Sequence, residues 1–474
     1  MLAAAKTNFD KQTKHGSTLS GITRAQESEK QWSKLCESFL PVAVKGSFWR
    51  YSRGLLAEDP EQGIKLHLSA TILSANVLLQ KVGGFLRQQR VQFKAPASLK
   101  DIERLNSGIG ASYSQIGKII TVYTRNFDEA TFLAYELDRL TADLAGPTVP
   151  FDTRFKPGSI VYYRYGAYQK LDLELANGCR VPAVKDLEGN LVPDVRQSSS
   201  ESNGKQLRAR ASIQDRSFEI IKAISQRGKG GVYQVLDLDF TPPRLCLLKE
   251  GRALGELDWD GIDGKLRVLR EESVMKALRA KGLDLPRVYS SFQESGNYYL
   301  LTEFVEGENL NGVLLAQRRR FSVVRSLTLA LSLAEFIASL HHVGWVWRDC
   351  KPSNLILTTG NGLRPVDFEG ACPIGQQNPP RWLTPAYSLK KTIAAPAGTD
   401  EDLHALGVII YLLLTGQLPD VPHRLPVKSL RKNVPQRLLD LLATLLNERV
   451  SRLIDSDVVA RELRLILKDL RSQD

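Results

Sequence analysis

The chain has 474 residues, of which 43% are hydrophobic and 24% charged, so disorder along its whole length is excluded and two domains are expected. Its net charge of +12 favours anionic partners, although no motif supports nucleic-acid binding. Five scattered cysteines without a CxxC pair exclude a disulfide framework and a structural zinc site, and the start of the chain lacks a signal peptide. The longest apolar run, residues 406–414, is too short to span a membrane, which predicts a cytoplasmic protein without a membrane span.

In chain order, the composition predicts four segments. Residues 1–30 are polar and predict a flexible arm, whereas residues 31–176 mix helical and strand patterns and predict the first domain. Residues 177–214 contain a Ser-, Asn- and Gly-rich stretch and predict a linker. Residues 215–474 run from strand-like segments into long apolar helices, as in a bilobal domain. The predicted fold class is therefore α+β.

In the first domain, Lys65 and His67 alternate along a strand-like segment, so their side chains point to the same face. Taken one at a time, a lysine is usually solvated and a strand histidine is usually structural. Further basic residues follow along the chain, and together they supply the cations, the acid and the candidate base that a phosphomonoester site needs: Lys94, Lys118, Arg154 and Arg164.

In the second domain, a glycine-rich turn lies between two strand-like runs and could fold over phosphates, although an ordinary hairpin explains the same pattern. Its three candidate residues are Gly228, Gly230 and Gly231. Lys249 follows on a buried strand, where an unpaired ammonium would be costly. Glu271 falls on the next helical pattern and is expected to pair with Lys249.

The segments 347–355 (WRDCKPSNL) and 366–370 (VDFEG) resemble the catalytic loop and the metal-binding motif of protein kinases. The resemblance implies a kinase-like fold that uses ATP (or GTP) and Mg²⁺. Asp349 would accept or orient the proton of the substrate hydroxyl and Lys351 would steady the transferred phosphoryl group, while Asn354 and Asp367 would hold Mg²⁺.

Two further elements of the kinase pattern are present, and several positions depart from it. Residues 302–305 look like the hinge, so Glu303 and Val305 would lie at the nucleotide, and Asp402 matches the aspartate that anchors the catalytic loop. Trp347 replaces the usual histidine and Glu369 the usual glycine. None of these departures removes a phosphoryl-transfer group, although a catalytically dead kinase is an alternative.

Residues 38–176 resemble the phosphothreonine lyases and, more closely, the lyase domain of class III and IV lanthipeptide (lanthionine) synthetases. The resemblance implies that Lys94 removes the α-proton of phosphoserine or phosphothreonine and that His67 protonates the departing phosphate. It assigns the binding of phosphate, or the stabilisation of the enolate-like carbanion, to the other basic residues, with Tyr123 and Tyr163 as neighbours: Lys65, Lys118, Arg154 and Arg164. Neighbouring cations and partial desolvation should lower the pKa of Lys94, and a phosphate dianion should keep His67 protonated.

The order of lyase, linker and kinase matches these synthetases, and so predicts a bifunctional dehydratase of a precursor peptide that carries a leader and a Ser/Thr-containing core. No cysteine follows Cys372, so a C-terminal zinc cyclase and zinc itself are not expected. A separate cyclase could then close any thioether ring. The alternatives are a Ser/Thr kinase with a degenerate lyase-like module and a peptide-binding pseudoenzyme scaffold.

Overall fold

The computed structural model describes thirteen ranges: residues 14–15, 19–43, 46–109, 112–169, 171–194, 209–213, 216–316, 320–360, 362–380, 382–389, 395–419, 426–446 and 454–472. The chain forms two compact units. One comprises residues 20–269 and 291–301, and the other comprises residues 1–19, 270–290 and 302–474. Both contain helices and sheets, which confirms the mixed α+β fold.

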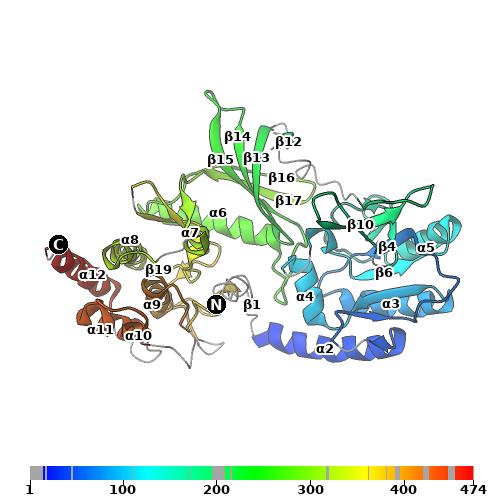
Figure 1. Cartoon of the computed structure of the whole chain (residues 1–474), viewed down its shortest axis with the longest axis horizontal. Helices are drawn as coiled ribbons and strands as arrows, with labels where there is room; N and C mark the ends of the chain where they lie inside the picture. The colour runs from blue at the N-terminus through cyan, green and yellow to red at the C-terminus, as the bar shows by residue number, and fades with distance from the viewer. Residues whose placement is uncertain are drawn as a thin grey trace. The chain divides into compact units, whose positions relative to one another are not determined.

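The first unit contains a seven-stranded sheet in which every pair of neighbours is antiparallel (Figure 1). Its order is β2 (Val42–Ala43), β3 (Trp49–Tyr51), β5 (Gln92–Pro96), β6 (Ile120–Tyr123), β4 (Gln62–Leu68), β8 (Val161–Ala167) and β7 (Thr153–Arg154). Alternate residues such as Leu66, Phe93 and Val122 are fully buried. They share one core with α3 (Ala75–Gln88), α4 (Leu99–Ser107) and α5 (Phe127–Leu140). Because that face is buried, the residues between them must point to the opposite face.

Residues 19–39, most of which fall in the segment predicted to be a flexible arm, form helix α2 (Leu19–Phe39), so this part of the prediction is wrong. Trp32, Cys36 and Leu40 are completely buried at helical spacing, and the Trp32 indole donates a hydrogen bond to Pro96 O at 3.2 Å. The remaining surface of the helix is polar, which is why the composition suggested an arm. Most of residues 1–18 lie outside the described residues.

The predicted linker, residues 177–214, is also partly ordered. A three-stranded sheet in the order β11-β10-β9 is built from β9 (Asp172–Glu174), β10 (Arg180–Lys185) and β11 (Leu191–Pro193). The Gln62 side chain fixes this sheet to β4, because its amide nitrogen donates to Lys185 O at 2.8 Å and its oxygen accepts from Lys185 N at 2.7 Å. Residues 195–208 lie outside the described residues.

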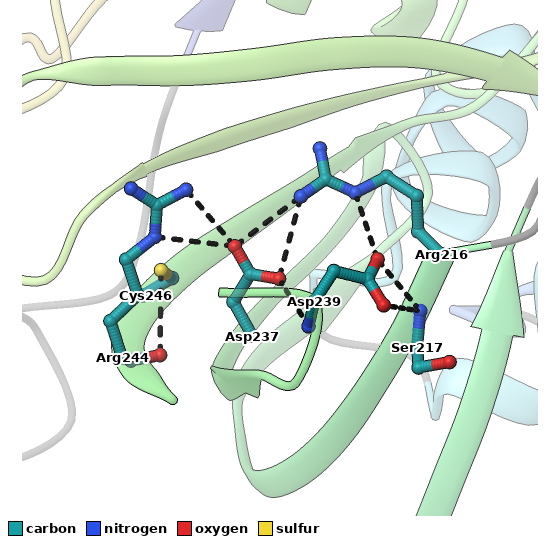
Figure 2. Close-up of polar contacts among 6 residues, drawn as sticks. All are labelled: Arg216, Ser217, Asp237, Asp239, Arg244 and Cys246. Atoms are coloured by element: carbon teal, nitrogen blue, oxygen red, sulfur yellow. Dashed lines mark hydrogen bonds and ion pairs between the residues drawn. The ribbon is translucent and has the colours of Figure 1, made fainter. Parts of the chain in front are cut away.

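A second sheet follows, in the order β12 (Ala209–Ile213), β13 (Arg216–Arg227), β14 (Gly230–Asp237), β15 (Arg244–Gly251), β17 (Asn297–Glu303) and β16 (Val288–Glu294). A buried carboxylate joins three of its strands, as Figure 2 shows. Asp237 accepts hydrogen bonds from Arg244 at 3.0 and 3.2 Å and from Arg216 at 3.3 and 3.4 Å. Arg216 also forms an ion pair with Asp239 at 3.6 Å. These bonds fix the ends of β13, β14 and β15 together.

The second unit is built mainly from helices: α6 (Gly264–Ala280, which begins in the first unit), α7 (Leu310–Ala316), α8 (Val323–His342), α9 (Thr399–Thr415), α10 (Val427–Leu430), α11 (Gln436–Leu445) and α12 (Ser456–Arg471). Short strands complete it: β18 (Glu308–Asn309), β20 (Leu355–Leu357) and β21 (Leu363–Pro365), the pair β19 (Trp345–Val346) and β22 (Cys372–Pro373), and the pair β1 (Lys14–His15) and β23 (Trp382–Leu383).

Helices α8 and α9 form the centre of this unit, and α9 is buried over most of its length. By length and composition α8 could cross a membrane, but half of its apolar stretch is buried inside the protein. Core helices pass the same test, so α8 is weak evidence for a membrane span.

Candidate functional site

The register of the seven-stranded sheet places most of the expected lyase residues on one face. Six directly paired residues form a central row across the strands: Tyr51, Lys94, Thr121, His67, Tyr162 and Arg154. A second row lies two residues further along each strand: Gln92, Tyr123, Lys65 and Arg164. Directly paired residues share a face, as do residues i and i+2 on one strand. Both rows therefore lie on the face opposite the core.

His67 and Lys118 are joined through a carboxylate that sequence analysis did not select. Asp152 Oδ2 lies 2.5 Å from His67 Nδ1, and Asp152 Oδ1 lies 2.7 Å from Lys118 Nζ. All three side chains are buried. Asp152 fixes the imidazole so that Nδ1–H donates to the carboxylate and Nε2 remains available for a ligand. Lys118 is thus brought to the site although it lies before β6.

Asp152 precedes Arg154 by two residues, and it follows Phe151, whose φ of +63° is left-handed. This backbone conformation is uncommon for a residue other than glycine. The only sequence signal was the position of Asp152 inside the basic stretch 151–157, because its partners lie 85 and 34 residues away.

Burial lowers the pKa of His67 from its usual 6.5, although the bond to Asp152 acts in the opposite sense. The imidazole is therefore neutral in the protein without ligand. The expectation that His67 is held protonated thus depends on the negative charge of a bound phosphate, which would raise its pKa.

Lys94 has the surroundings expected of a neutral amine. Its Nζ lies 4.2 Å from the ring centre of Trp49 and 5.8 Å from that of Tyr123. Burial lowers the pKa of Lys94 to about 8. Of the two causes expected for this decrease, neighbouring cations and desolvation, the structure supplies desolvation.

Lys65 and Arg154 lie beside aromatic rings on the same face. Lys65 Nζ is 5.9 Å from the ring centre of Tyr123, and the Arg154 guanidinium is 4.8 Å from that of Tyr162. Arg154 also donates to Ser159 O at 2.8 Å. These contacts orient both cations while leaving part of each side chain exposed.

Arg164 lies beside Lys65 in the second row but already has an anionic partner. Its Nη2 is 2.7 and 2.5 Å from the two carboxylate oxygens of Asp194, which follows β11. Asp194 therefore balances the charge of Arg164 in the protein without ligand. Tyr163, in contrast, pairs with Leu66 and points to the core face, so its expected place beside the site is wrong.

The kinase-like catalytic loop is closely interconnected within the second unit. Asp349 Oδ2 accepts hydrogen bonds from Lys351 Nζ and from Asn354 Nδ2, both at 2.8 Å. Thr384 Oγ1 lies 3.2 Å from Lys351 Nζ and 3.4 Å from Asp349 Oδ1. Burial raises the pKa of Asp349, and Lys351 opposes this effect. The acid, the lysine and the asparagine expected to act together thus meet at one point.

Asn354 and Asp367, the two residues expected to hold Mg²⁺, both carry side-chain oxygen atoms of the kind that this ion prefers. Asn354 commits its amide nitrogen to Asp349, which leaves its amide oxygen as the group that can bind a cation. Val366 N donates to Asn354 O at 2.9 Å and so joins the two motifs. Mg²⁺ usually takes one or two protein oxygens together with substrate phosphates, so these residues fit it.

Trp347 performs the structural role left open by the missing histidine. Its indole nitrogen donates to Asp367 O at 2.8 Å, and its ring stacks on Phe368 with centres 5.5 Å apart. The Asp402 carboxylate accepts hydrogen bonds from the backbone amides of Trp347 and Arg348, both at 2.7 Å. Glu369, in place of the usual glycine, is accommodated as a buried residue whose carbonyl accepts from Arg270.

The glycine-rich hairpin between β13 and β14 packs against the first domain. Gly228 N donates to Ser107 O at 3.0 Å, and a Cβ on Gly228 would lie 1.6 Å from Asn106 O. A Cβ on Gly230 would lie 1.7 Å from Glu250 O. Gly231 is similarly close to the Tyr233 ring. Backbone contacts thus require Gly228 and Gly230, whereas a Cβ on Gly231 would meet only a side chain, and the expected role of all three at a nucleotide stays a prediction.

The remaining nucleotide candidates occupy the expected elements. Lys249 lies on β15 opposite Val232, and Glu271 is buried on α6. Their ion pair stays a prediction. Glu303 ends β17, where its carboxylate accepts from Arg364 at 2.9 Å, and Val305 follows it.

Comparison with known proteins identifies both domains. Residues 42–202 match the RamC N-terminal domain and residues 256–459 the protein kinase domain, a family that implies use of ATP and Mg²⁺. A probable SapB synthase of Streptomyces coelicolor is 25% identical over 401 residues, which are 79% of this chain and 42% of that protein.

The kinase domain also resembles serine/threonine-protein kinases of other organisms. The serine/threonine-protein kinases PknA of Nostoc and D of Synechocystis are 28% and 24% identical over 43% of this chain, and the matches cover 38% and 41% of their lengths. The chain thus spans about two fifths of each of these relatives. The chain thus joins a RamC-type N-terminal domain to a protein kinase domain, the organisation expected of a lanthipeptide synthetase of the lyase–kinase type.

Proposed function

We propose that the chain dehydrates Ser and Thr residues of a precursor peptide in two steps. The kinase domain phosphorylates a side-chain hydroxyl with ATP and Mg²⁺, and the RamC-type domain eliminates the phosphate to give dehydroalanine or dehydrobutyrine. One observation carries this proposal. A lysine whose pKa is lowered to about 8 and a histidine fixed by a carboxylate flank Thr121 on one face of the sheet, among cations that suit a phosphate.

In the elimination, neutral Lys94 takes the proton from Cα of the phosphorylated residue. The electron pair of the broken C–H bond becomes the new Cα–Cβ double bond, and the Cβ–O bond breaks with its electrons leaving on the phosphate. His67 donates a proton from Nε2 to the departing oxygen, while Asp152 stabilises the imidazolium through Nδ1. The cations around the phosphate, including Lys118 and Arg154, favour its departure.

In the phosphoryl transfer, Asp349 orients the substrate hydroxyl and accepts its proton. Lys351 and Thr384, which both contact Asp349, hold the attacking group and the transferred phosphoryl in place. Asn354 and Asp367 would hold Mg²⁺, which neutralises negative charge on the phosphate oxygens.

The precursor peptide is proposed to carry a leader that docks on the protein and a core that is modified. Ring closure would then require a separate cyclase or proceed without one. The full chain, incubated with such a peptide, ATP and Mg²⁺, should produce peptide that has lost one water for each modified residue, as measured by mass spectrometry.

Variants separate the two steps. His67→Ala should accumulate phosphorylated peptide, and Asp349→Asn should leave the peptide unmodified while still converting a synthetic phosphopeptide. A wild-type protein that only phosphorylates would instead identify a Ser/Thr kinase with a degenerate lyase module. A wild-type protein that binds the peptide without changing it would identify a scaffold.

A further inference from the structure

We propose that Thr121 forms the floor beneath the reacting carbon atoms of the lyase substrate and thereby sets how the site discriminates phosphothreonine from phosphoserine. The inference rests on the proposed lyase function and deepens it, because it assigns substrate selectivity to one residue of the central row.

The position of Thr121 follows from the strand register. Thr121 pairs with Lys94 on β5 and with His67 on β4, so it lies midway between them on the same face. Neighbouring strands lie about 4.8 Å apart, which separates the Cα atoms of Lys94 and His67 by roughly 10 Å. A lysine and a histidine side chain projecting from these positions can reach the two ends of a single Cα–Cβ–O unit held above Thr121. Thr121 itself is 4% exposed and is the shortest side chain of the row.

The chemistry of the two sides gives the substrate an orientation. On the Lys94 side the wall is the ring of Trp49, while the ring of Tyr123 stands on the strand of Thr121 itself. On the His67 side lie the Lys118 ammonium, held through Asp152, and the Arg154 guanidinium at the far end of the row. The phosphate must therefore occupy the His67 side, and the Cα–H bond must face Lys94. This orientation places Cβ, the atom between them, over Thr121.

Phosphothreonine differs from phosphoserine by one methyl group, and that methyl group is attached to Cβ. A side chain below Cβ consequently limits the room for the methyl group more than it limits any other substrate atom. One methylene in a close-fitting pocket changes selectivity by about 10- to 200-fold. The β-branched threonine of this protein is small enough to leave that room, whereas one further carbon atom should occupy it.

The test uses the full chain without nucleotide and two synthetic peptides that differ only in carrying phosphoserine or phosphothreonine. Release of phosphate gives kcat/KM for each peptide. Thr121→Ile should lower kcat/KM for the phosphothreonine peptide at least about tenfold more than for the phosphoserine peptide. Thr121→Val, which keeps the volume and removes the hydroxyl, should leave the ratio of the two values within about twofold. Thr121→Ser, which removes the methyl group, should shift the ratio toward phosphothreonine.

Thr124→Val is the matched control, because Thr124 follows the same strand and its hydroxyl donates to Ile64 O at 2.8 Å, away from the central row. It should leave the ratio unchanged. Equal losses for both peptides in Thr121→Ile, or a valine variant as selective as the isoleucine variant, would overturn the proposal. If Thr121→Ile does not fold, an unchanged ratio in Thr121→Ser overturns it instead. Failure of the wild-type protein to eliminate phosphate from either peptide would refute the proposed lyase function, which is a different result.

Discussion

The lyase rate should rise with pH as the Lys94 ammonium loses its proton. Burial lowers the pKa of this group from 10.5 to about 8. At pH 7, about one molecule in ten then carries a neutral amine, compared with about one in 3,000 at the ordinary pKa. The protein environment therefore increases the reactive form about 300-fold. The rate should climb with pH while the bound phosphate keeps His67 protonated, and it should fall at higher pH, where the imidazolium loses its proton.

The variant Lys94→Arg tests whether Lys94 acts as the base. A guanidinium stays protonated throughout this pH range, so the variant keeps the positive charge and loses the base. We expect its elimination rate to fall by about 10²- to 10⁴-fold, the usual contribution of a general base. Lys81→Arg is the control, because Lys81 forms a surface ion pair with Asp143 on the helical side of the domain.

The assay is single-turnover elimination from a synthetic phosphoserine peptide without nucleotide, followed by mass spectrometry over a series of pH values. Single-turnover conditions remove product release from the measured rate. A rate independent of pH between about 6 and 9, or an arginine variant with wild-type activity, would refute the assignment of Lys94 as the base.

Three further predictions follow from single contacts. Asp152→Asn should accumulate phosphopeptide in the coupled reaction without changing the phosphorylation rate, because His67 and Lys118 lose the charge that fixes them; equal losses in both steps would contradict this. Trp347→Ala should abolish transfer of labelled phosphate from ATP, whereas Trp347→His, which keeps a ring N–H donor, should retain part of the transfer; a fully active alanine variant would show the indole to be dispensable. Asp237→Ala should lower the free energy of unfolding in urea by about 2 kcal/mol. This is less than the usual cost of breaking a buried ion pair, because both arginines keep contact with water. A loss of less than about 0.5 kcal/mol would contradict this prediction.

The sequence by itself determined the features that depend on local spacing. The alternation of Lys65 and His67 fixed their common face, and the resemblance of residues 347–355 to the kinase catalytic loop placed Asp349, Lys351 and Asn354 together in one loop. Such predictions succeed because strand periodicity and a single loop involve neighbouring residues only.

The tertiary structure decided the features that depend on register and long-range packing. Asp152 reaches His67 from 85 residues away, and Asp194 reaches Arg164 from a segment whose composition resembled a linker. The composition did not reveal helix α2, because its large buried side chains are few and are spread along a mostly polar segment, with Trp32 and Cys36 as examples. Local composition carries no information about which distant carboxylate neutralises a cation or which polar segment covers a core, because both are settled only when strands pair and helices pack.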